Sequence, residues 1–455
     1  MTNYNFYGLK QPLFICIPTE NHIASYFCYI STSDNFRKYV MNDQSKISVS
    51  APHEKRNFWA FVWHAVWLAL AQTFADRNTV LPGLILLVGG TKTHLGILTA
   101  ILIGLPVFSQ LLFAAYLSQK IYKKNFLLLG IYLRVFAFGG VAWTLSLHAR
   151  FSPSTVILLV YFWMLLFTIS GAFAGVSYTD VLGKSIKGDL RKNFLVVRQF
   201  LSSIGVLISA LAVRQILQSF EYPENYKIAF EFAFVLLFIA SLGFIAIKEN
   251  PTEISEDRTS LLQLIKSIPS VIKNGKNLKN IVITSNLVGF AISLIPFYIS
   301  LVKDKFHLDK SVIGNLLLLQ IIGMIVSNFF WSKIVKKKAF KGVLFFDILL
   351  EGSIPVIAIL LAYFGSLTYF TLLFFLIGTA LSAHKIAFEG VLLEISTDEN
   401  RALYSGVFGA LSLTIAVFPL LVGYLISSTG YVPIFLLSSI IIFSSLVFYK
   451  RLECN

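Results

Sequence analysis

Ionisable side chains inside long apolar segments are the residues of this sequence that could do chemistry. A charged side chain at the centre of a membrane helix costs about 2.5–3.5 kcal/mol on insertion scales, so it usually serves a partner or a function. The first apolar segment contains His64, Gln72, Asp76 and Arg77. We interpret Asp76 as a site for a substrate or a proton, with Arg77 adjusting its ionisation or binding an anion. A structural charge network at the end of the segment is the alternative.

A second set of ionisable residues lies in the apolar segment 368–392 and comprises His384, Lys385 and Glu389. Lys385 and Glu389 are one helical turn apart, so they can pair and lower each other's cost of burial. Glu389 would suit proton coupling, which needs a carboxylate that gains and loses a proton as its surroundings change. A permanent ion pair with Lys385 is an equal alternative, and His384 points to a different face.

Other polar residues within apolar segments have structural interpretations that compete with functional ones. His64 could titrate near neutral pH, but a histidine held by a hydrogen bond is the favoured interpretation. Asn286, beside Thr284 and Ser285, suits either a polar substrate or helix packing. Asp347 and Glu351 share one helix face, and Arg134 occupies the place of Asp347 in the sequence repeat described below. We interpret these three charges as structural pairs.

The elements that must position these residues are membrane-spanning helices. The chain of 455 residues is 56% hydrophobic and only 13% charged, too little charge to cover a water-soluble protein of this length. Apolar runs of about 20 residues recur, which is the length that crosses the hydrocarbon core as a helix. Twelve spans are predicted, at 58–88, 95–117, 126–147, 153–175, 198–219, 228–247, 278–301, 312–332, 342–363, 368–392, 404–426 and 431–449.

The net charge of +15 follows membrane topology rather than nucleic-acid binding. Lys and Arg number 25 on one set of alternate connections together with residues 46–56 and the C-terminal tail, and six on the other set. The positive-inside rule then places both termini and the central loop in the cytoplasm. We expect an integral protein of a plasma membrane, such as a bacterial inner membrane, and no nucleic-acid partner.

The chain repeats itself. Ser118–Lys124 (SQKIYKK) resembles Trp331–Lys337 (WSKIVKK), and each follows one apolar segment and leads into the next. Pro82 and Pro296, near the ends of the first and seventh spans, are separated by almost the same offset in numbering. Repeated halves indicate a pseudo-twofold axis along the membrane normal. The predicted organisation is a tail at 1–56, a six-helix half at 57–247, a linker at 248–277, a six-helix half at 278–449 and a tail at 450–455.

These features resemble the major facilitator superfamily over residues 56–450. The family's loop between the second and third spans reads G-x-x-x-D-R-x-G-R-R/K, and Ala115–Lys124 stands at that place. The basic residues Lys120, Lys123 and Lys124 fit the motif, whereas Gln119 replaces its aspartate. The family's charged latch is therefore not carried over to Gln119. The resemblance implies two pseudo-symmetric six-helix bundles in an all-α integral membrane protein, with spans 1, 4, 7 and 10 lining a central cavity and spans 3, 6, 9 and 12 outside it.

Residues of the basic loops and inner helix ends are candidates for gating, although helix capping and topology explain them equally well. Two stretches, Phe74–Pro82 and Phe388–Ile395, resemble a group of bacterial facilitators, which identifies a relative and not a substrate. The gating candidates are Gln119, Lys120, Lys123, Lys124, Asp180, Arg191, Lys333 and Arg401.

The linker and the first tail carry two further predictions. Apolar residues at helical spacing in 261–272, with Lys266 and Lys273 opposite, predict an amphipathic helix at the membrane surface, interrupted by Pro269. A lipid-resting helix is favoured over a partner site. The segment 1–50 lacks the features of a signal peptide, and Met41 is an alternative start of translation.

The resemblance implies a secondary active transporter that moves a small solute by alternating access. Asp76 and Glu389 motivate proton coupling, and the scarcity of charge in the cavity spans favours efflux over uptake of a sugar-like nutrient. An assembly factor or sensor on the same fold is the alternative from another class. No nucleophile–base, metal or cofactor motif is present in the sequence, so we expect neither enzymatic activity nor a cofactor. The expected partners are the lipid bilayer, a small-molecule substrate and protons, and the expected state is a monomer.

Overall fold

The structure is a computed structural model that describes residues 13–14, 30–31, 52–117, 120–186, 188–251, 261–306, 310–397 and 401–453. Met41 and Gln119 lie outside the described residues, as does the side chain of Arg401. Two short antiparallel strands of two residues each, β1 (Leu13–Phe14) and β2 (Ile30–Ser31), lie in the first tail.

The N-terminal half contains helices that match the predicted spans in place, with differences at several ends. They are α2 (Pro52–Phe74), α3 (Val80–Leu87), α4 (Lys92–Thr99), the π-helix η2 (Ala100–Gly104), α5 (Leu105–Leu117), α6 (Lys124–Ser146), the 3₁₀-helix η3 (His148–Arg150), α7 (Pro153–Ser185), α8 (Gly188–Ser219) and α9 (Glu224–Ile245).

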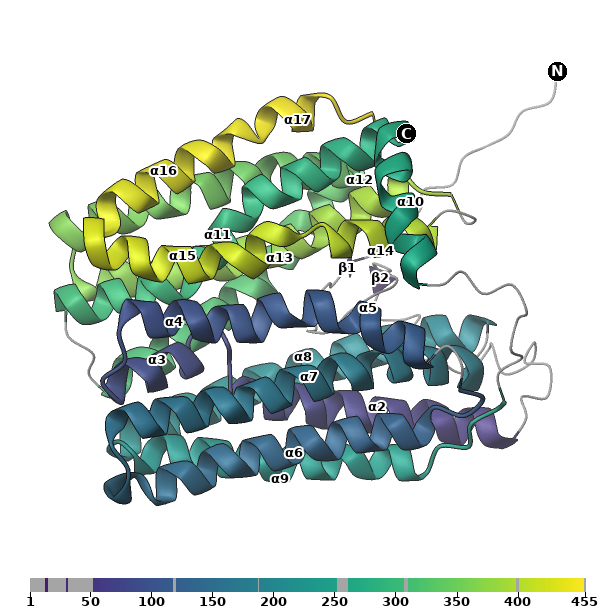
Figure 1. Cartoon of the computed structure of the whole chain (residues 1–455), viewed down its shortest axis with the longest axis horizontal. Coiled ribbons are helices and arrows are strands. Elements are labelled where there is room, and N and C mark those ends of the chain that lie inside the picture. The colour runs from purple at the N-terminus through teal and green to yellow at the C-terminus, as the bar shows by residue number, and fades with distance from the viewer. Residues whose placement is uncertain are drawn as a thin grey trace.

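The linker and the C-terminal half follow the same scheme. Their helices are α10 (Leu261–Asn274), α11 (Lys276–Phe306), α12 (Lys310–Phe364), α13 (Leu367–Glu394), α14 (Arg401–Ala410), α15 (Leu413–Thr429), α16 (Tyr431–Ser444) and α17 (Leu446–Lys450). In Figure 1 the linker helix α10 lies beside the C-terminal half at one end of the bundle. Ile268 and Ile272 of α10 pack against a core cluster of that half, whereas lipid contact was expected for this apolar face.

The predicted membrane architecture is confirmed. Within the described ranges, nine helices are long and apolar enough to cross a membrane. One of them, α12, contains the eighth and ninth spans, joined at a sharp turn where Ala339 has φ 54° and ψ −171°. The first and second spans are divided between α2 and α3 and between α4, η2 and α5, which completes twelve crossing segments.

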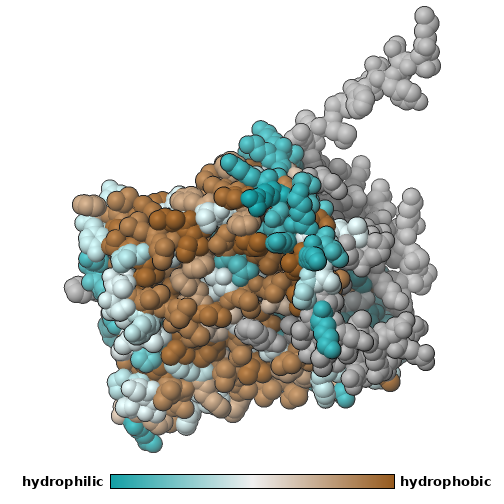
Figure 2. Space-filling model, turned by 45° about the horizontal axis from the view of Figure 1, so that its top comes forward, coloured by the Kyte–Doolittle hydropathy of each residue, from teal (hydrophilic) through white to brown (hydrophobic). Residues whose placement is uncertain are grey.

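The surface has the character of a lipid-facing one. Figure 2 shows a broad hydrophobic band across the side of the molecule, with hydrophilic residues gathered at the ends of the helices. Large apolar side chains of the membrane helices are exposed, such as Phe136 at 61% and Phe162 at 55%. A soluble protein rarely exposes so continuous an apolar surface, so this band is the membrane contact.

The first span is broken where Asp76 stands. The helix ends at Phe74 and resumes at Val80. In the turn between them, the Asp76 Oδ1 accepts hydrogen bonds from the Asn78 backbone N–H (3.0 Å), the Thr79 backbone N–H (2.8 Å) and the Thr79 hydroxyl (2.7 Å). The expectation of a continuous 58–88 span weakened at Pro82 is therefore wrong. Pro82 lies in the first turn of α3, where a proline is tolerated.

The eleventh span is broken as well, between Ala410 and Leu413. Asn286 of α11 bridges this break. Its side-chain amide donates to the Leu411 carbonyl (2.8 Å), and its Oδ1 accepts from the backbone N–H and the hydroxyl of Thr414 (3.0 and 3.1 Å). Backbone groups freed within a membrane must find such partners, so Asn286 makes the break tolerable.

The two halves meet closely along two pairs of helices. A Cβ atom at Gly104 in η2 would lie 2.8 Å from the Cα atom of Ala416 in α15. A Cβ atom at Gly314 in α12 would lie 2.7 Å from the Cα atom of Arg214 in α8. Glycine is required at such contacts because any side chain would push the helices apart. Figure 1 shows α4 and α5 running along the boundary between the two halves.

Candidate functional site

A cavity of about 230 Å³ lies where the N-terminal half faces the C-terminal half. Its walls come from the broken first span, from η2 and α5, and from α6, α7 and the start of α15. Its polar lining residues are Gln72, Arg77, Arg134, Thr168 and Ser412. The remaining lining residues are apolar, and no described lining residue is acidic.

Arg134 is the cavity residue whose place the sequence did not predict. Arg134 is only 4% exposed, and its guanidinium carbon lies 4.2 Å from the centre of the Phe167 ring on α7. Gly171 on the same helix leaves room for it, because a Cβ atom there would already contact the Arg134 Nε atom at 3.4 Å. The third span therefore lines the cavity, and its expected place outside the cavity is wrong.

The predicted residues of the first span have separate surroundings. Gln72 and Arg77 line the cavity, whereas Asp76 holds the turn of the broken span through its Oδ1. His64 is buried away from the cavity lining, with its Nδ1 atom 3.0 Å from the Ala240 carbonyl oxygen and its ring stacked on Phe244 at 3.9 Å. These contacts fit the structural interpretation of His64.

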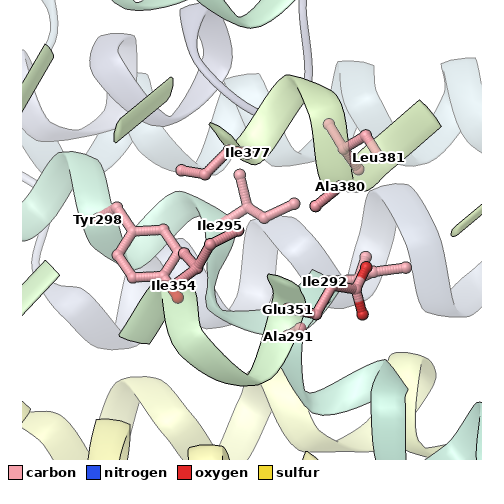
Figure 3. A pocket seen from close by; sticks show the side chains of 9 residues that line it. All are labelled: Ala291, Ile292, Ile295, Tyr298, Glu351, Ile354, Ile377, Ala380 and Leu381. Atoms are coloured by element: carbon pink, nitrogen blue, oxygen red, sulfur yellow. The ribbon is translucent and has the colours of Figure 1, made fainter. Parts of the chain in front are cut away.

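A cluster of two carboxylates and a histidine is buried in the C-terminal half. Asp347 and Glu351 of α12 are 0% and 3% exposed. The His384 Nδ1 atom on α13 lies 3.2 Å from the Glu351 Oε1 and 3.6 Å from the Asp347 Oδ2. Figure 3 shows the Glu351 carboxylate beside a small cavity lined mainly by the apolar side chains of α11, α12 and α13.

The three side chains of this cluster are of the types that can share a proton or bind a cation. One ligand atom from each of its three residues lies within 4.8 Å of the others. Two carboxylates this close in an apolar region cannot both be ionised without a compensating charge, and a protonated His384 would supply one. The cluster brings together residues that the sequence interpretation had separated, since Asp347 and Glu351 were interpreted as structural and His384 as a substrate or proton candidate.

Lys385 and Glu389 stand apart from both cavities. They are partly buried on α13, and neither lines a cavity described above. The His384 ring packs on Phe388 at 4.5 Å. The carboxylates within 3.6 Å of the His384 Nδ1 atom, those of Asp347 and Glu351, come from the neighbouring helix α12.

Polar contacts join the halves at the end of the bundle opposite the basic loops, which we call the outer end. Lys92 Nζ lies 2.9 Å from the Asp304 carboxylate, which also accepts a hydrogen bond from the Tyr431 hydroxyl (2.8 Å). Lys303 Nζ donates to the Leu86 carbonyl (2.7 Å). A single core cluster also contains buried residues of both halves, such as Leu84 and Leu294. The outer end is thus closed.

The basic loop after the second span is anchored within its own half. Glu249, after the sixth span, accepts hydrogen bonds from the backbone N–H groups of Lys123 and Lys124 at 2.7 and 2.8 Å. Lys184 bridges Glu249 and Asp180, and Asp180 also pairs with Lys123 at 2.8 Å. Glu249 thus provides an acid beside the loop in which Gln119 replaces the family's aspartate.

Two further gating candidates, Arg191 and Lys120, contact groups close to them in the chain. Arg191 donates to the Ile186 carbonyl (2.9 Å) and to the Gly183 carbonyl (2.5 Å), which caps the end of α7. Lys120 lies over the Tyr116 ring at 4.9 Å. Lys333 is exposed, and nothing is described of the Arg401 side chain.

Comparison with known proteins identifies the family to which this fold belongs. The sequence matches the family model described as Major Facilitator Superfamily over residues 66–338 and again over residues 281–453. A search of curated proteins gives no match.

Solved structures with the same fold are transporters of different kinds. A bacterial homologue of the human lysosomal transporter Spinster, in an inward-facing and occupied conformation, has 12% sequence identity and a TM-score of 0.59, over 88% of this chain and 97% of that chain. The human organic anion transporter MFSD10 has 15% identity and a TM-score of 0.59, over 89% and 100%. The nucleoside transporter NupG has 13% identity and a TM-score of 0.61, over 88% and 100%.

Proposed function

The chain belongs to the Major Facilitator Superfamily, and from that membership we propose that it is a secondary active transporter that moves a small solute by alternating access. The observation that carries the proposal is the cavity between the halves, combined with a closed outer end. In alternating access the outer end must open in turn. This opening requires Lys92 and Asp304 to separate while the two halves rotate against each other about the cavity.

Proton coupling belongs to the buried cluster of Asp347, Glu351 and His384. A coupling site must hold a proton in one state and release it in another, and a carboxylate–histidine pair in an apolar region is suited to this. Asp76, the first candidate from the sequence, has its Oδ1 engaged with the turn before α3, which supports a structural role.

Efflux was favoured because the cavity spans contain little charge, and two guanidinium groups in the cavity remove that reason. The similar structures include an organic anion transporter and a nucleoside transporter, so the fold alone does not select a substrate.

The test uses the full-length protein in proteoliposomes with a pH-sensitive dye trapped inside. A panel of small anions, nucleosides, sugars and short peptides is added, and the change in internal pH is recorded. We expect at least one solute class to move protons in wild-type vesicles and not in protein-free vesicles.

State-dependent labelling supplies the second arm. Single cysteines introduced near the outer end and near the cavity should change their accessibility in opposite directions when the solute is present. A protein that stays in one state with every solute and gradient, and moves none of them, would replace this proposal with the sensor or assembly-factor alternative.

A further inference from the structure

We propose that the side chains of Asp347, Glu351 and His384 form a binding site for one divalent transition-metal ion of the class of Zn²⁺ or Co²⁺. The inference goes beyond the proposed transport function, because binding of an ion at this cluster requires no movement of a solute. A metal ion and a proton are alternative occupants of the cluster, since both bind through the same oxygen and nitrogen atoms.

The chemical types of the three side chains are the first argument. One imidazole nitrogen and two carboxylates are ligands that Zn²⁺ and its neighbours in the first transition series accept. The imidazole distinguishes this set from the all-oxygen sites of Mg²⁺ and Ca²⁺. Two ionised carboxylates carry two negative charges, which one divalent ion neutralises. A neutral total charge lowers the cost of burying these groups inside a membrane.

The spacing of the ligand atoms is the second argument. Asp347 and Glu351 are one helical turn apart on α12, so both carboxylates leave the same face, and His384 reaches them from α13. The His384 Nδ1 atom lies 3.6 Å from Asp347 Oδ2 and 3.2 Å from Glu351 Oε1. Two ligands bonded at about 2.0–2.1 Å to one tetrahedral ion are about 3.3 Å apart. The cluster therefore already has the spacing that one shared ion requires.

The third and independent argument concerns the hydrogen bonds of these atoms. Asp347 is 0% exposed, and among the described residues neither of its carboxylate oxygens has a hydrogen-bond partner. The same holds for Glu351 Oε2, and His384 Nδ1 lies beside both carboxylates yet makes a hydrogen bond to neither. Ligands of a shared ion are placed in this way, because each is directed at a point between them and not at the next ligand. Buried polar atoms without partners are rare in native proteins, and a bound ion is one explanation for them.

The small cavity beside Glu351 provides room for a fourth ligand. Its volume of about 10 Å³ is about the minimum that admits one water molecule. The other polar residue among its described lining is Tyr298 on α11, whose buried hydroxyl also has no hydrogen-bond partner within the described ranges (Figure 3). A water molecule there completes the four-coordinate arrangement that is usual for Zn²⁺. The His384 side chain is 15% exposed, which leaves the ion a way in.

The experiment measures metal binding to the purified full-length protein by isothermal titration calorimetry, after treatment with a chelator that is then removed. The probes are the chlorides of Zn²⁺, Co²⁺, Mg²⁺ and Ca²⁺. We expect one Zn²⁺ or Co²⁺ ion per chain to bind at least tenfold more tightly than Mg²⁺ or Ca²⁺, because imidazole favours transition metals. The visible absorption of Co²⁺ gives a second readout, since a four-coordinate ion absorbs far more strongly than a hydrated six-coordinate one.

The variants Asp347→Asn, Glu351→Gln and His384→Gln each remove one ligand. We expect each to weaken Zn²⁺ binding at least tenfold and to remove the strong Co²⁺ absorption. The matched controls are Glu453→Gln and His53→Gln, because both residues are exposed, and these should bind Zn²⁺ like wild type. Thermal unfolding shows whether each variant is folded. If a ligand variant does not fold, the Co²⁺ spectrum of the wild-type protein decides.

Absence of a one-to-one Zn²⁺ site in the wild-type protein would overturn the inference. So would unchanged Zn²⁺ affinity in folded Glu351→Gln and His384→Gln variants, because the ion would then be held by other side chains. Zn²⁺ binding that the ligand variants lose, in a protein that moves no solute, would leave the metal site standing and overturn the proposed transport. Transport of a solute by a protein without this Zn²⁺ site would have the reverse meaning.

Discussion

His384 Nδ1 on α13 lies 3.2 Å from Glu351 Oε1 on α12, inside the apolar core of the C-terminal half. The neighbouring Asp347 corresponds in the sequence repeat to Arg134 of the other half, which lines the cavity. The two halves thus use equivalent positions for opposite charges. In the proposed mechanism, the N-terminal half binds the solute and the C-terminal half holds the proton.

The variant Glu351→Gln tests the proton site. We expect it to reduce transport driven by a pH gradient at least tenfold, because the amide cannot release a proton at this position. Solute exchange without a gradient should persist, since exchange needs no net proton movement. Both rates are measured in proteoliposomes with labelled solute. Glu453→Gln is the control, because Glu453 is exposed and pairs with Lys276. Equal loss of both rates would assign Glu351 to folding or solute binding instead.

The Lys92–Asp304 pair tests the outer closure. The variant Lys92→Asp places two carboxylates together and should favour opening of the outer end. The double variant Lys92→Asp/Asp304→Lys should restore closure, because the attraction returns with its sign reversed. The measurement is the labelling rate of a single cysteine placed near Gly314 with an impermeant reagent. A labelling rate that is the same in all three proteins would show that packing alone holds this end closed.

The bridge made by Asn286 should contribute to stability. The variant Asn286→Ala leaves the Thr414 N–H without its side-chain acceptor inside the membrane. We expect a loss of about 1–3 kcal/mol in the free energy of unfolding, as for a buried polar group deprived of its partner. Thermal unfolding in detergent measures the loss. Ser293→Ala on the same helix is the control, because the hydrogen bond that the Ser293 hydroxyl makes among the described residues goes to its own helix, to the Gly289 carbonyl. Equal stability of the two variants would contradict the role of the bridge.

The anchor of the basic loop should depend on Glu249. Its carboxylate binds the backbone N–H groups of Lys123 and Lys124 and pairs with Lys184, and its side chain is 4% exposed. We expect Glu249→Ala to cost about 1–3 kcal/mol of stability, because these groups lose a charged acceptor. Limited proteolysis at the loop and thermal unfolding provide the measurements. Glu224→Ala, at a half-exposed carboxylate that pairs with its helix neighbour Lys227, should change little. A Glu249 variant as stable and protease-resistant as this control would rule out the anchor.

The sequence by itself determined the features that depend on neighbouring residues. Apolar runs predict the spans, because a membrane helix must be apolar along its own length. The repeated basic loop and the nearly constant offset between matching positions predict two related halves. The spacing of Leu261, Ile268 and Ile272 predicts the linker helix, which the structure places at Leu261–Asn274. Each of these signals can be read within one segment, or by comparing one segment with its repeat.

Only the tertiary structure decided which polar groups meet. Arg134 reaches the cavity because α6 presents it past Gly171 of α7, and His384 meets Glu351 because α12 and α13 pack side by side. Lys92 and Asp304 belong to different halves of the chain, yet their charged groups lie 2.9 Å apart in space. Such contacts depend on the rotation and depth of each helix relative to its neighbours. Those are set by packing between helices, which no single segment of the sequence contains.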